Sequence, residues 1–132
     1  MTLLDSNVVI GYLKGDPAIV ARIQHTAASE LALPAVVVYE LEYGTLRSKI
    51  ADRRRRQLEQ GFAHIRRIPF DSDAAVAAAR ICFQLERRGS TIGPHDLMIA
   101  GTALSRGATL VTHNTAEFSR VPGLRTIDWQ SP

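Results

Sequence analysis

Cysteine is almost absent from this sequence. Cys82 is the one cysteine among 132 residues, so the chain forms no internal disulfide, which is typical of a protein in a reducing compartment. No apolar run approaches the roughly 18 residues that a membrane helix needs. No basic start precedes an apolar core, as it would in a signal peptide. We therefore expect a cytoplasmic protein that makes no contact with a membrane.

Several motifs of common α/β proteins are also missing. No Cys/His pair has the spacing of a zinc site, because the four histidines are scattered along the chain. No Gly-x-Gly-x-x-Gly follows the first apolar run, which argues against a dinucleotide-binding domain. A phosphatase of the Asp-x-Asp type is disfavoured because Asn7 stands where the second aspartate is required, and a receiver domain because no lysine lies beyond residue 49.

Lysine is scarce as well, and arginine takes its place. The net charge is +3 and the sequence pI is near 9.5, but only Lys14 and Lys49 are lysines among 16 basic residues. Residues 47–67, called the basic segment below, carry a net charge of +6. Arginine binds phosphate in a planar, bidentate way, so this segment predicts a polyanionic partner, with a solvated helix face as an equally weighted alternative. Four consecutive arginines, residues 53–56, cover about 300° of a helix, so this helix should project at the edge of the domain.

The alternation of apolar segments predicts the fold class. With 45% hydrophobic residues, the chain suits one globular domain, residues 1–132. Short strands are expected at residues 1–4, 31–33, 67–69, 109–112 and 124–127. Helices are expected between them, at residues 6–15, 16–28, 36–46, 50–64, 71–89 and 95–105. Strands separated by helices predict a three-layer α/β/α sandwich with a central, mainly parallel sheet of about five strands.

Four acidic side chains lie where a strand gives way to a helix. They are Asp5, Glu40, Asp96 and Glu117. Because the carboxyl ends of parallel strands lie side by side, acids that are distant in sequence converge there. Carboxylates that repel one another are costly unless a cation neutralises them, and hard divalent cations prefer oxygen ligands. The pattern therefore predicts a metal site, although each acid taken alone also suits a helix cap or an exposed surface.

The residues alone leave two assignments open. Glu40 and Glu42 lie about 160° apart on one helix, and periodicity does not choose between them. Asn114 and Glu117 are one helical turn apart, so they either share a site or cap a short helix.

Four segments resemble the motifs of PIN-domain ribonucleases, in the same order along the chain. These segments are Leu3–Ile10, Val38–Gly44, Ile92–Ala100 and Leu110–Phe118. The closing segment Gly123–Trp129 also resembles the tail of the VapC toxins of bacterial type II toxin–antitoxin pairs. The resemblance spans nearly the whole chain, and four ordered motifs are far more specific than any single acid.

The resemblance implies a magnesium-dependent endoribonuclease toxin, with Mn²⁺ as a substitute ion. It selects Glu40 over Glu42, and it makes Asp5 and Asp96 the main metal ligands. Glu40 and Glu117 would complete the metal site. The same resemblance suggests that two further residues position phosphate or water; these are Thr112 and Asn114.

The resemblance also implies partners. The substrate would be RNA, with tRNA as the family-level expectation, and a small antitoxin would place its tail over the acidic site. A homodimer is expected, supported by the apolar third helix, and DNA would be bound only through the antitoxin complex. Many PIN domains have aspartate where this chain has Asn114, so the alternative is a catalytically weak, PIN-shaped nucleic-acid-binding or regulatory module.

Overall fold

The fold is built from five short strands and the helices between them. A computed structural model describes residues 1–130, and the last two residues of the expected domain lie outside the described part. The strands are β1 (Thr2–Leu4), β2 (Leu31–Pro34), β3 (Arg66–Ile68), β4 (Thr109–Val111) and β5 (Thr126–Ile127). The helices are α1 (Ser6–Leu13), α2 (Pro17–Gln24), α3 (Ala35–Arg47), α4 (Ala51–Phe62), α5 (Ser72–Arg87), α6 (Pro94–Ser105) and α7 (Thr115–Phe118), with a 3-10 turn, η1, at Ala28–Glu30.

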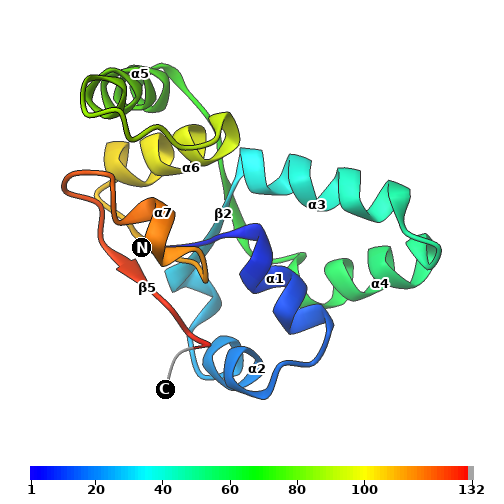
Figure 1. Cartoon of the computed structure of the whole chain (residues 1–132). Helices are drawn as coiled ribbons and strands as arrows, with labels where there is room; N and C mark the ends of the chain where they lie inside the picture. The colour runs from blue at the N-terminus through cyan, green and yellow to red at the C-terminus, as the bar shows by residue number, and fades with distance from the viewer. Residues whose placement is uncertain (131–132) are drawn as a thin grey trace.

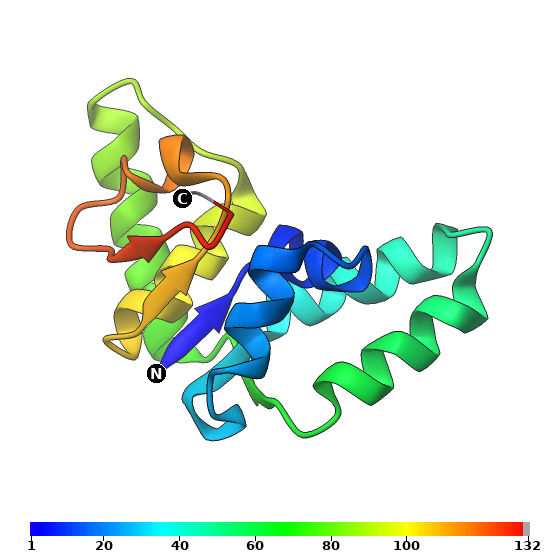
Figure 2. The ribbon, with the colours of Figure 1, turned by 90° about the horizontal axis from the view of Figure 1, so that it is seen from below.

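All five strands are parallel, in the order β3-β2-β1-β4-β5. The chain moves outward from β1 to β3, then returns to β4 beside β1 and moves outward in the other direction. Since crossovers between parallel strands are right-handed, α5, α6 and α7 lie on one side of the sheet and the first four helices on the other. Figures 1 and 2 show this division. The expected three-layer α/β/α fold with a parallel sheet is confirmed.

The reversal of strand order places the ends of β1 and β4 side by side. Leu4 pairs with Val111, and the N–H of Asp5 donates to the Val111 carbonyl at 2.9 Å. The pairing therefore brings Asp5 next to Thr112, the residue that follows β4. Ligands of open α/β sheets bind at such a reversal point, so the fold itself selects this edge.

The strands are held by burial on both faces. Every residue of β2 is buried, as are Leu3, Leu4, Leu110 and Val111 in the two central strands. Strands of a parallel sheet are covered by helices on both sides, which explains these continuous apolar runs. Asp16 caps α2 and Asp71 caps α5, because each accepts hydrogen bonds from backbone N–H groups of the first helical turn.

Helices α3 and α4 form a hairpin that projects from the body of the molecule (Figure 1). Its tip and α4 carry most of the basic segment. A projecting helix was expected there, because four consecutive arginines cannot all lie on one outward face of a helix. Across the described residues, no helix combines the length and the apolarity required to span a membrane.

The buried face of α5 coincides only in part with the stripe that helical spacing predicts, which runs through Ala75, Ala78, Ala79, Cys82 and Leu85. Ala78 and Leu85 are buried as that spacing predicts, whereas Ala75 and Ala79 are exposed and Cys82 is only half-buried. The buried residues of the helix are Ala74, Ala78, Ile81 and Leu85. Alanine is compatible with either face of a helix, so the alanine-rich stretch did not fix the orientation. The fifth strand is also shorter than expected, beginning at residue 126.

Candidate active site

Asp5 occupies the centre of the polar site at the end of β1. Its side chain is buried, with 4% of the residue exposed, yet both oxygens have partners. Oδ1 accepts from the Ser6 N–H at 2.8 Å, while Oδ2 accepts from Thr112 Oγ1 at 2.7 Å and from Asn7 Nδ2 at 3.1 Å. Burial raises the pKa of Asp5 above its ordinary value of 3.8, and these three hydrogen bonds oppose that shift. The carboxylate is therefore an N-cap of α1, held in a fixed orientation by three hydrogen bonds.

Glu117 reaches the same region from α7. Its Oε1 accepts from the Gly93 N–H at 2.9 Å, and its Oε2 accepts from Asn114 Nδ2. These hydrogen bonds, the one from Gly93 foremost, lower the pKa of Glu117 below its ordinary value of 4.5. The Asn114 side chain makes no capping bond to α7. Asn114 is thus the N-cap residue of α7 by position, but its side chain donates to Glu117 instead of capping the helix.

Asp96 lies in the first turn of α6, facing three other carboxylates. Desolvation raises its pKa to about 7, helped by the hydrogen bond with Glu117 and by the charges of Glu117, Asp5 and Glu40. The pKa of Asp96 is thus raised while that of Glu117 is lowered, so one proton is bound more tightly by this pair than by two separate carboxyl groups. The four predicted acids thus act on one another electrostatically, although up to 112 positions separate them in the chain.

The structure distinguishes the two glutamates of α3. Glu42 forms an ion pair with Arg55 of α4, at 3.0 Å from Oε1 to Nη1, away from the site. Glu40 lies 3.4 Å from Nδ1 of His95, measured from Oε2, and it contributes to the charge around Asp96. Its other oxygen, Oε1, is buried without a hydrogen-bond partner. Glu40, and not Glu42, therefore lies near Asp96, which is the choice that the resemblance implied.

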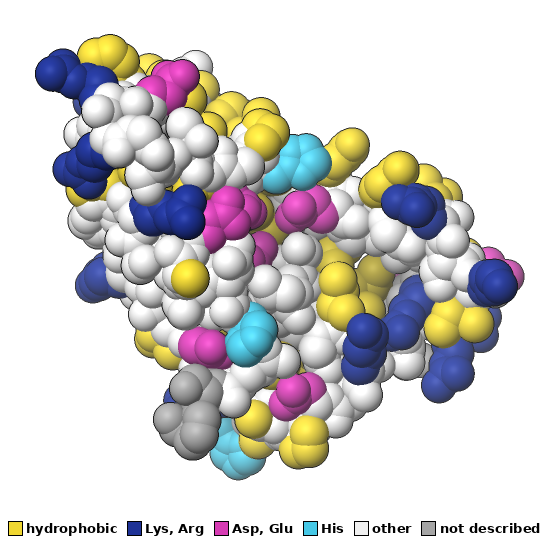
Figure 3. Space-filling model, in the orientation of Figure 1, with side chains coloured by type: hydrophobic (Ala, Val, Ile, Leu, Met, Phe, Trp, Pro, Cys, Tyr) yellow, Lys and Arg dark blue, Asp and Glu magenta, His cyan; other side chains and the backbone are white. Residues whose placement is uncertain are grey.

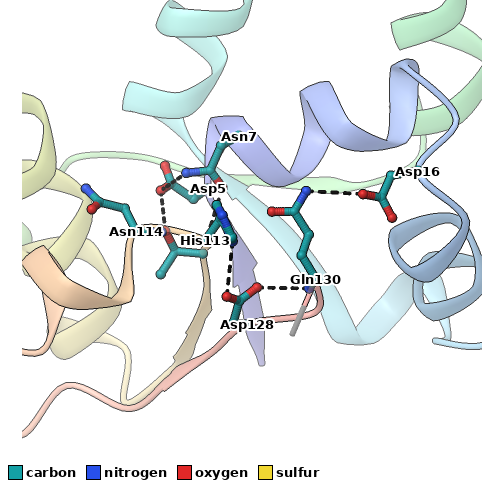
Figure 4. A network of polar contacts seen from close by, with 8 residues as sticks. Asp5, Asn7, Asp16, His113, Asn114, Asp128 and Gln130 are labelled. Atoms are coloured by element: carbon teal, nitrogen blue, oxygen red, sulfur yellow. Dashed lines mark hydrogen bonds and ion pairs between the residues drawn. The ribbon is translucent and has the colours of Figure 1, made fainter. Parts of the chain in front are cut away.

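A hydrogen-bond network continues from Asp5 to the C-terminal segment (Figure 4). Asn7 bridges the site, since its amide donates to Asp5 and its Oδ1 accepts from the His113 N–H at 3.2 Å. His113 Nδ1 lies 3.1 Å from Asp128, whose other oxygen accepts from the Gln130 N–H at 2.9 Å. This network ties the loop after β4 to α1 and fixes the position of Thr112.

The donor set suits a hard divalent cation. Figure 3 shows acidic side chains gathered in a hollow between α7 and the start of α3. Among residues 1–130, no lysine or arginine forms an ion pair with the four acids, and Glu40 Oε1 lacks a partner. In the same part of the chain, no three His, Cys, Asp or Glu side chains stand at metal-ligand spacing. The carboxylates of Asp5 and Glu117 instead accept hydrogen bonds from protein donors. Carboxylate oxygens are the ligands that hard divalent cations prefer.

Comparison with known proteins places the chain in a family. Residues 2–124 match the PIN domain. The chain is 39% identical, over 127 residues that cover 96% of each protein, to the tRNA(fMet)-specific endonuclease VapC of Shigella flexneri. The chain belongs to the VapC family of PIN-domain ribonucleases. A second VapC, the tRNA(fMet)-specific endonuclease of Salmonella typhimurium, is 34% identical over 127 residues, again 96% of each protein.

Solved VapC-containing structures share the fold over nearly the whole chain. The DNA-bound VapBC of Salmonella typhimurium matches with a TM-score of 0.90 and 35% identity, covering 97% of each chain. VapBC2 of Rickettsia felis, bound to a DNA fragment from its promoter, matches with a TM-score of 0.90 and 28% identity, covering 97% of this chain and 98% of that one. The expected PIN-like architecture of a VapC ribonuclease is confirmed.

Sequence reasoning did not assign a role to two residues that the structure places at the site. Asn7 lies two residues after Asp5, and this spacing was the available signal for its bond to that carboxylate. His95 directly precedes Asp96 in the sequence, and it lies against Glu40. The contacts of Asn7 with His113 and of His95 with Glu40 do not follow from residue spacing, because each joins elements that are distant in the sequence.

Proposed function

We propose that this VapC protein is the toxin of a toxin–antitoxin pair and cleaves RNA, with tRNA as the substrate class, using Mg²⁺ or Mn²⁺. The observation that carries the proposal is the group of four interacting carboxylates, with the pKa of Asp96 raised to about 7. Such a group is unstable at neutral pH unless a proton or a cation compensates its charge.

Asp5 and Asp96 would hold the ion, with Glu40 and Glu117 completing the site. The divalent cation, when bound, supplies Lewis-acid chemistry, lowering the pKa of water and offsetting negative charge on the phosphate. In the cleavage, the water oxygen attacks phosphorus, the bond to the 3′-oxygen breaks, and the leaving oxygen takes a proton. The products are a 5′-phosphate and a 3′-hydroxyl.

The surrounding residues keep the carboxylates in place. Thr112 and Asn7 fix the orientation of the Asp5 carboxylate through their hydrogen bonds. Asn114 and the Gly93 N–H restrain Glu117 in the same manner, so Asn114 serves the site without carrying charge. Hydrogen bonds of this kind orient ligands, and their loss typically lowers metal affinity or activity by about 10- to 100-fold.

RNA would reach this acidic site along the α3–α4 hairpin. The basic segment, residues 47–67, carries six net positive charges in a chain whose total is +3. Positive surface attracts the phosphates of RNA and raises the rate of encounter. This arrangement supports guidance of a polyanion toward a site that would otherwise repel it.

The antitoxin would cover the same site. A groove of about 180 Å³ lies between α1, α3 and α4, and its lining includes the apolar residues Ile10, Leu41 and Leu58 together with Glu40. It suits an apolar antitoxin tail that places an arginine or lysine among the carboxylates. We also propose a cytoplasmic homodimer, since the exposed Leu46 and Ile50 at the end of the hairpin offer an apolar surface. DNA would be bound only through the antitoxin complex.

The direct test is to incubate total RNA with purified protein and Mg²⁺, then to map the cleaved ends. We expect discrete cuts that leave 5′-phosphates, and no cuts in the presence of a chelator. Glu40→Gln should lower the cleavage rate by more than about 10-fold. Glu42→Gln is the matched control on the same helix, and it should leave the rate unchanged because Glu42 pairs with Arg55 outside the site.

Absence of cleavage by the wild-type protein with either ion would reject the enzymatic proposal. Binding of RNA without cleavage would then favour the alternative of a PIN-shaped module without catalysis.

A further inference from the structure

The residues that follow β5 turn back across the carboxyl end of the sheet. Residues 128–130, called the C-terminal strap below, run from β5 past the loop after β4 to the turn between α1 and α2 (Figure 4). Asp128 contacts His113 in the loop after β4. Gln130 Nε2 donates to Asp16 Oδ2, in the turn between α1 and α2, at 3.2 Å. The strap therefore joins three segments at the edge of the sheet that carries the candidate site.

The C-terminal strap is a fixed part of the fold. Trp129 is 7% exposed and belongs to the hydrophobic core. Just before the strap, the Ile127 carbonyl accepts a hydrogen bond from the Thr112 N–H at 3.0 Å. At the far end, the Asp16 carboxylate caps α2 with one oxygen and accepts a hydrogen bond from the strap with the other. Asp128 is therefore held by a backbone that is anchored before and after it.

Both carboxylate oxygens of Asp128 are used. Oδ1 accepts from the Gln130 N–H at 2.9 Å, and Oδ2 lies 3.1 Å from His113 Nδ1. Because a carboxylate only accepts hydrogen bonds, Nδ1 is the imidazole nitrogen that carries a proton in this contact. The His113 side chain is 64% exposed, whereas that of Asp128 is 18% exposed. The more buried carboxylate therefore holds the more exposed imidazole, and with it the loop after β4.

The backbone of His113 decides which end of the Asn7 amide faces Asp5. This amide has an acceptor, Oδ1, and a donor, Nδ2. The His113 N–H donates to Oδ1 at 3.2 Å, which leaves Nδ2 to donate to the Asp5 carboxylate at 3.1 Å. The reversed amide would place its oxygen against a negatively charged oxygen, and Asp5 would lose a donor. The contacts therefore run from the strap through His113 and Asn7 to Asp5.

We propose that Asp128 is a positioning residue of the candidate metal site, which holds the Asp5 carboxylate in place through His113 and Asn7. The proposal rests on the proposed metal-dependent ribonuclease function, and it extends the site to the C-terminal strap. Hydrogen-bond partners of a metal ligand fix its orientation. Residues further along such a network change the coupled affinity by about 2- to 30-fold.

The test measures Mn²⁺ affinity by calorimetry at pH 8 in variants that break one contact from either side. Asp128→Ala removes the contact from the strap. His113→Ala removes it from the exposed side, where loss of the ring disturbs less packing, so this variant still tests the contact if Asp128→Ala fails to fold. Each should weaken binding by about 2- to 30-fold. The double variant should bind no more weakly than either single variant, because both changes remove the same contact.

Asp128→Asn separates the contact from the charge. The asparagine oxygen can accept from the Gln130 N–H, and its amide can donate to Nδ1 of the other neutral imidazole tautomer. Asp128→Asn should therefore bind Mn²⁺ about as tightly as the wild type. A purely electrostatic effect of Asp128 on the ion would instead be lost in Asp128→Asn as fully as in Asp128→Ala.

A second measurement requires no metal. Exchange of the Asn7 side-chain NH₂ protons with water, followed by NMR in chelator, should be faster in Asp128→Ala than in the wild type or in Asp128→Asn. His25→Ala is the matched control, because His25 is an exposed histidine whose Nδ1 lies 2.7 Å from the Ala21 carbonyl of α2, outside the site. It should leave both Mn²⁺ affinity and Asn7 exchange unchanged.

Three results would overturn the proposal. The first is wild-type Mn²⁺ affinity in Asp128→Ala and His113→Ala while the wild-type protein binds the ion, which would leave the metal site intact and reject only the role of the strap. The second is equally weak binding in Asp128→Asn and Asp128→Ala, which would assign the effect to charge. The third is absence of Mn²⁺ binding by the wild-type protein, which would reject the metal site on which the proposal rests.

Discussion

The Thr112 hydroxyl donates a 2.7 Å hydrogen bond to the buried carboxylate of Asp5, although the two residues are 107 positions apart. The parallel pairing of β1 with β4 makes this contact, because Leu4 and Val111 are partners in the sheet and the next residue of each strand faces the other. Thr112 also accepts from the Asn114 N–H at 3.0 Å, so one hydroxyl connects the ends of both strands.

Replacing Thr112 by valine tests this connection. Valine keeps the shape but removes the hydroxyl, which leaves the buried Asp5 oxygen short of a donor. We expect the free energy of unfolding to fall by about 1–3 kcal/mol and RNA cleavage to fall by about 10-fold or more. Thr112→Ser keeps the hydroxyl and should stay close to wild type in both measurements. Equal activity of the valine and serine variants would show that the hydroxyl does not position Asp5.

Glu117→Gln should lower the pKa of Asp96 from about 7, since Glu117 is both its hydrogen-bond partner and a nearby negative charge. NMR titration of protein labelled at the aspartate carboxyl carbons measures this pKa directly. Glu42→Gln serves as the comparison. Because Glu42 is paired with Arg55 away from the site, this variant should leave the pKa of Asp96 unchanged. If the titration midpoint of Asp96 is the same in Glu117→Gln as in the wild type, Glu117 does not raise the pKa of Asp96.

The metal-free protein should gain stability as the pH is lowered from 8 toward 5. The pKa of Asp96 is about 7 in the folded protein and about 3.8 when unfolded, so the folded state binds the proton more tightly. This contribution is complete below the unfolded pKa and is lost as the pH rises through 7. Asp5, whose pKa is also raised, acts in the same direction. Thermal unfolding in chelator should show this trend.

Asp96→Asn provides the control for that trend, because it removes the titrating group. The thermal midpoint of this variant should vary less between pH 5 and 8. Added Mg²⁺ should stabilise the wild-type protein at pH 8 and have a smaller effect on Asp96→Asn. An identical pH dependence of the two proteins would contradict the assignment of the raised pKa to Asp96.

Gly101→Ala should destabilise the helix pair that carries Asp96. A Cβ at Gly101 would lie 2.7 Å from the Ala74 carbonyl oxygen and 2.8 Å from the Ala78 nitrogen, so α5 and α6 would have to move apart. Overpacking of this kind costs about 1–3 kcal/mol. Gly44→Ala, with no atom within 4 Å of the added Cβ, should instead stabilise α3 by roughly 0.5–1 kcal/mol. Chemical denaturation of both variants measures the difference.

The sequence was most informative where local chemistry decides the structure. The apolar pairs Leu3–Leu4 and Leu110–Val111, which end at Asp5 and Thr112, correctly predicted two buried strands, because both residues of each pair suit a sheet that is covered on both faces. Asp16 followed by Pro17 predicted the start of α2, since a cap and a first-turn proline act within one helical turn.

The remaining features depend on contacts between distant elements. Glu40 and Glu42 have equal local propensities, and only the docking of α4, which brings Arg55 to Glu42, separates them. The alanines of α5 suit either face, so Gly101 on the facing helix, through its close approach to Ala74 and Ala78, helps determine which face is buried.

Binding of Mn²⁺ to the purified protein, measured by calorimetry at pH 8, tests the central claim most directly. Wild-type protein should bind the ion, and Asp5→Asn and Asp96→Asn should each weaken binding by more than about 10-fold while keeping the fold. Glu42→Gln should bind as the wild type does. If both aspartate variants bound Mn²⁺ with wild-type affinity, the converging carboxylates would not be a metal site.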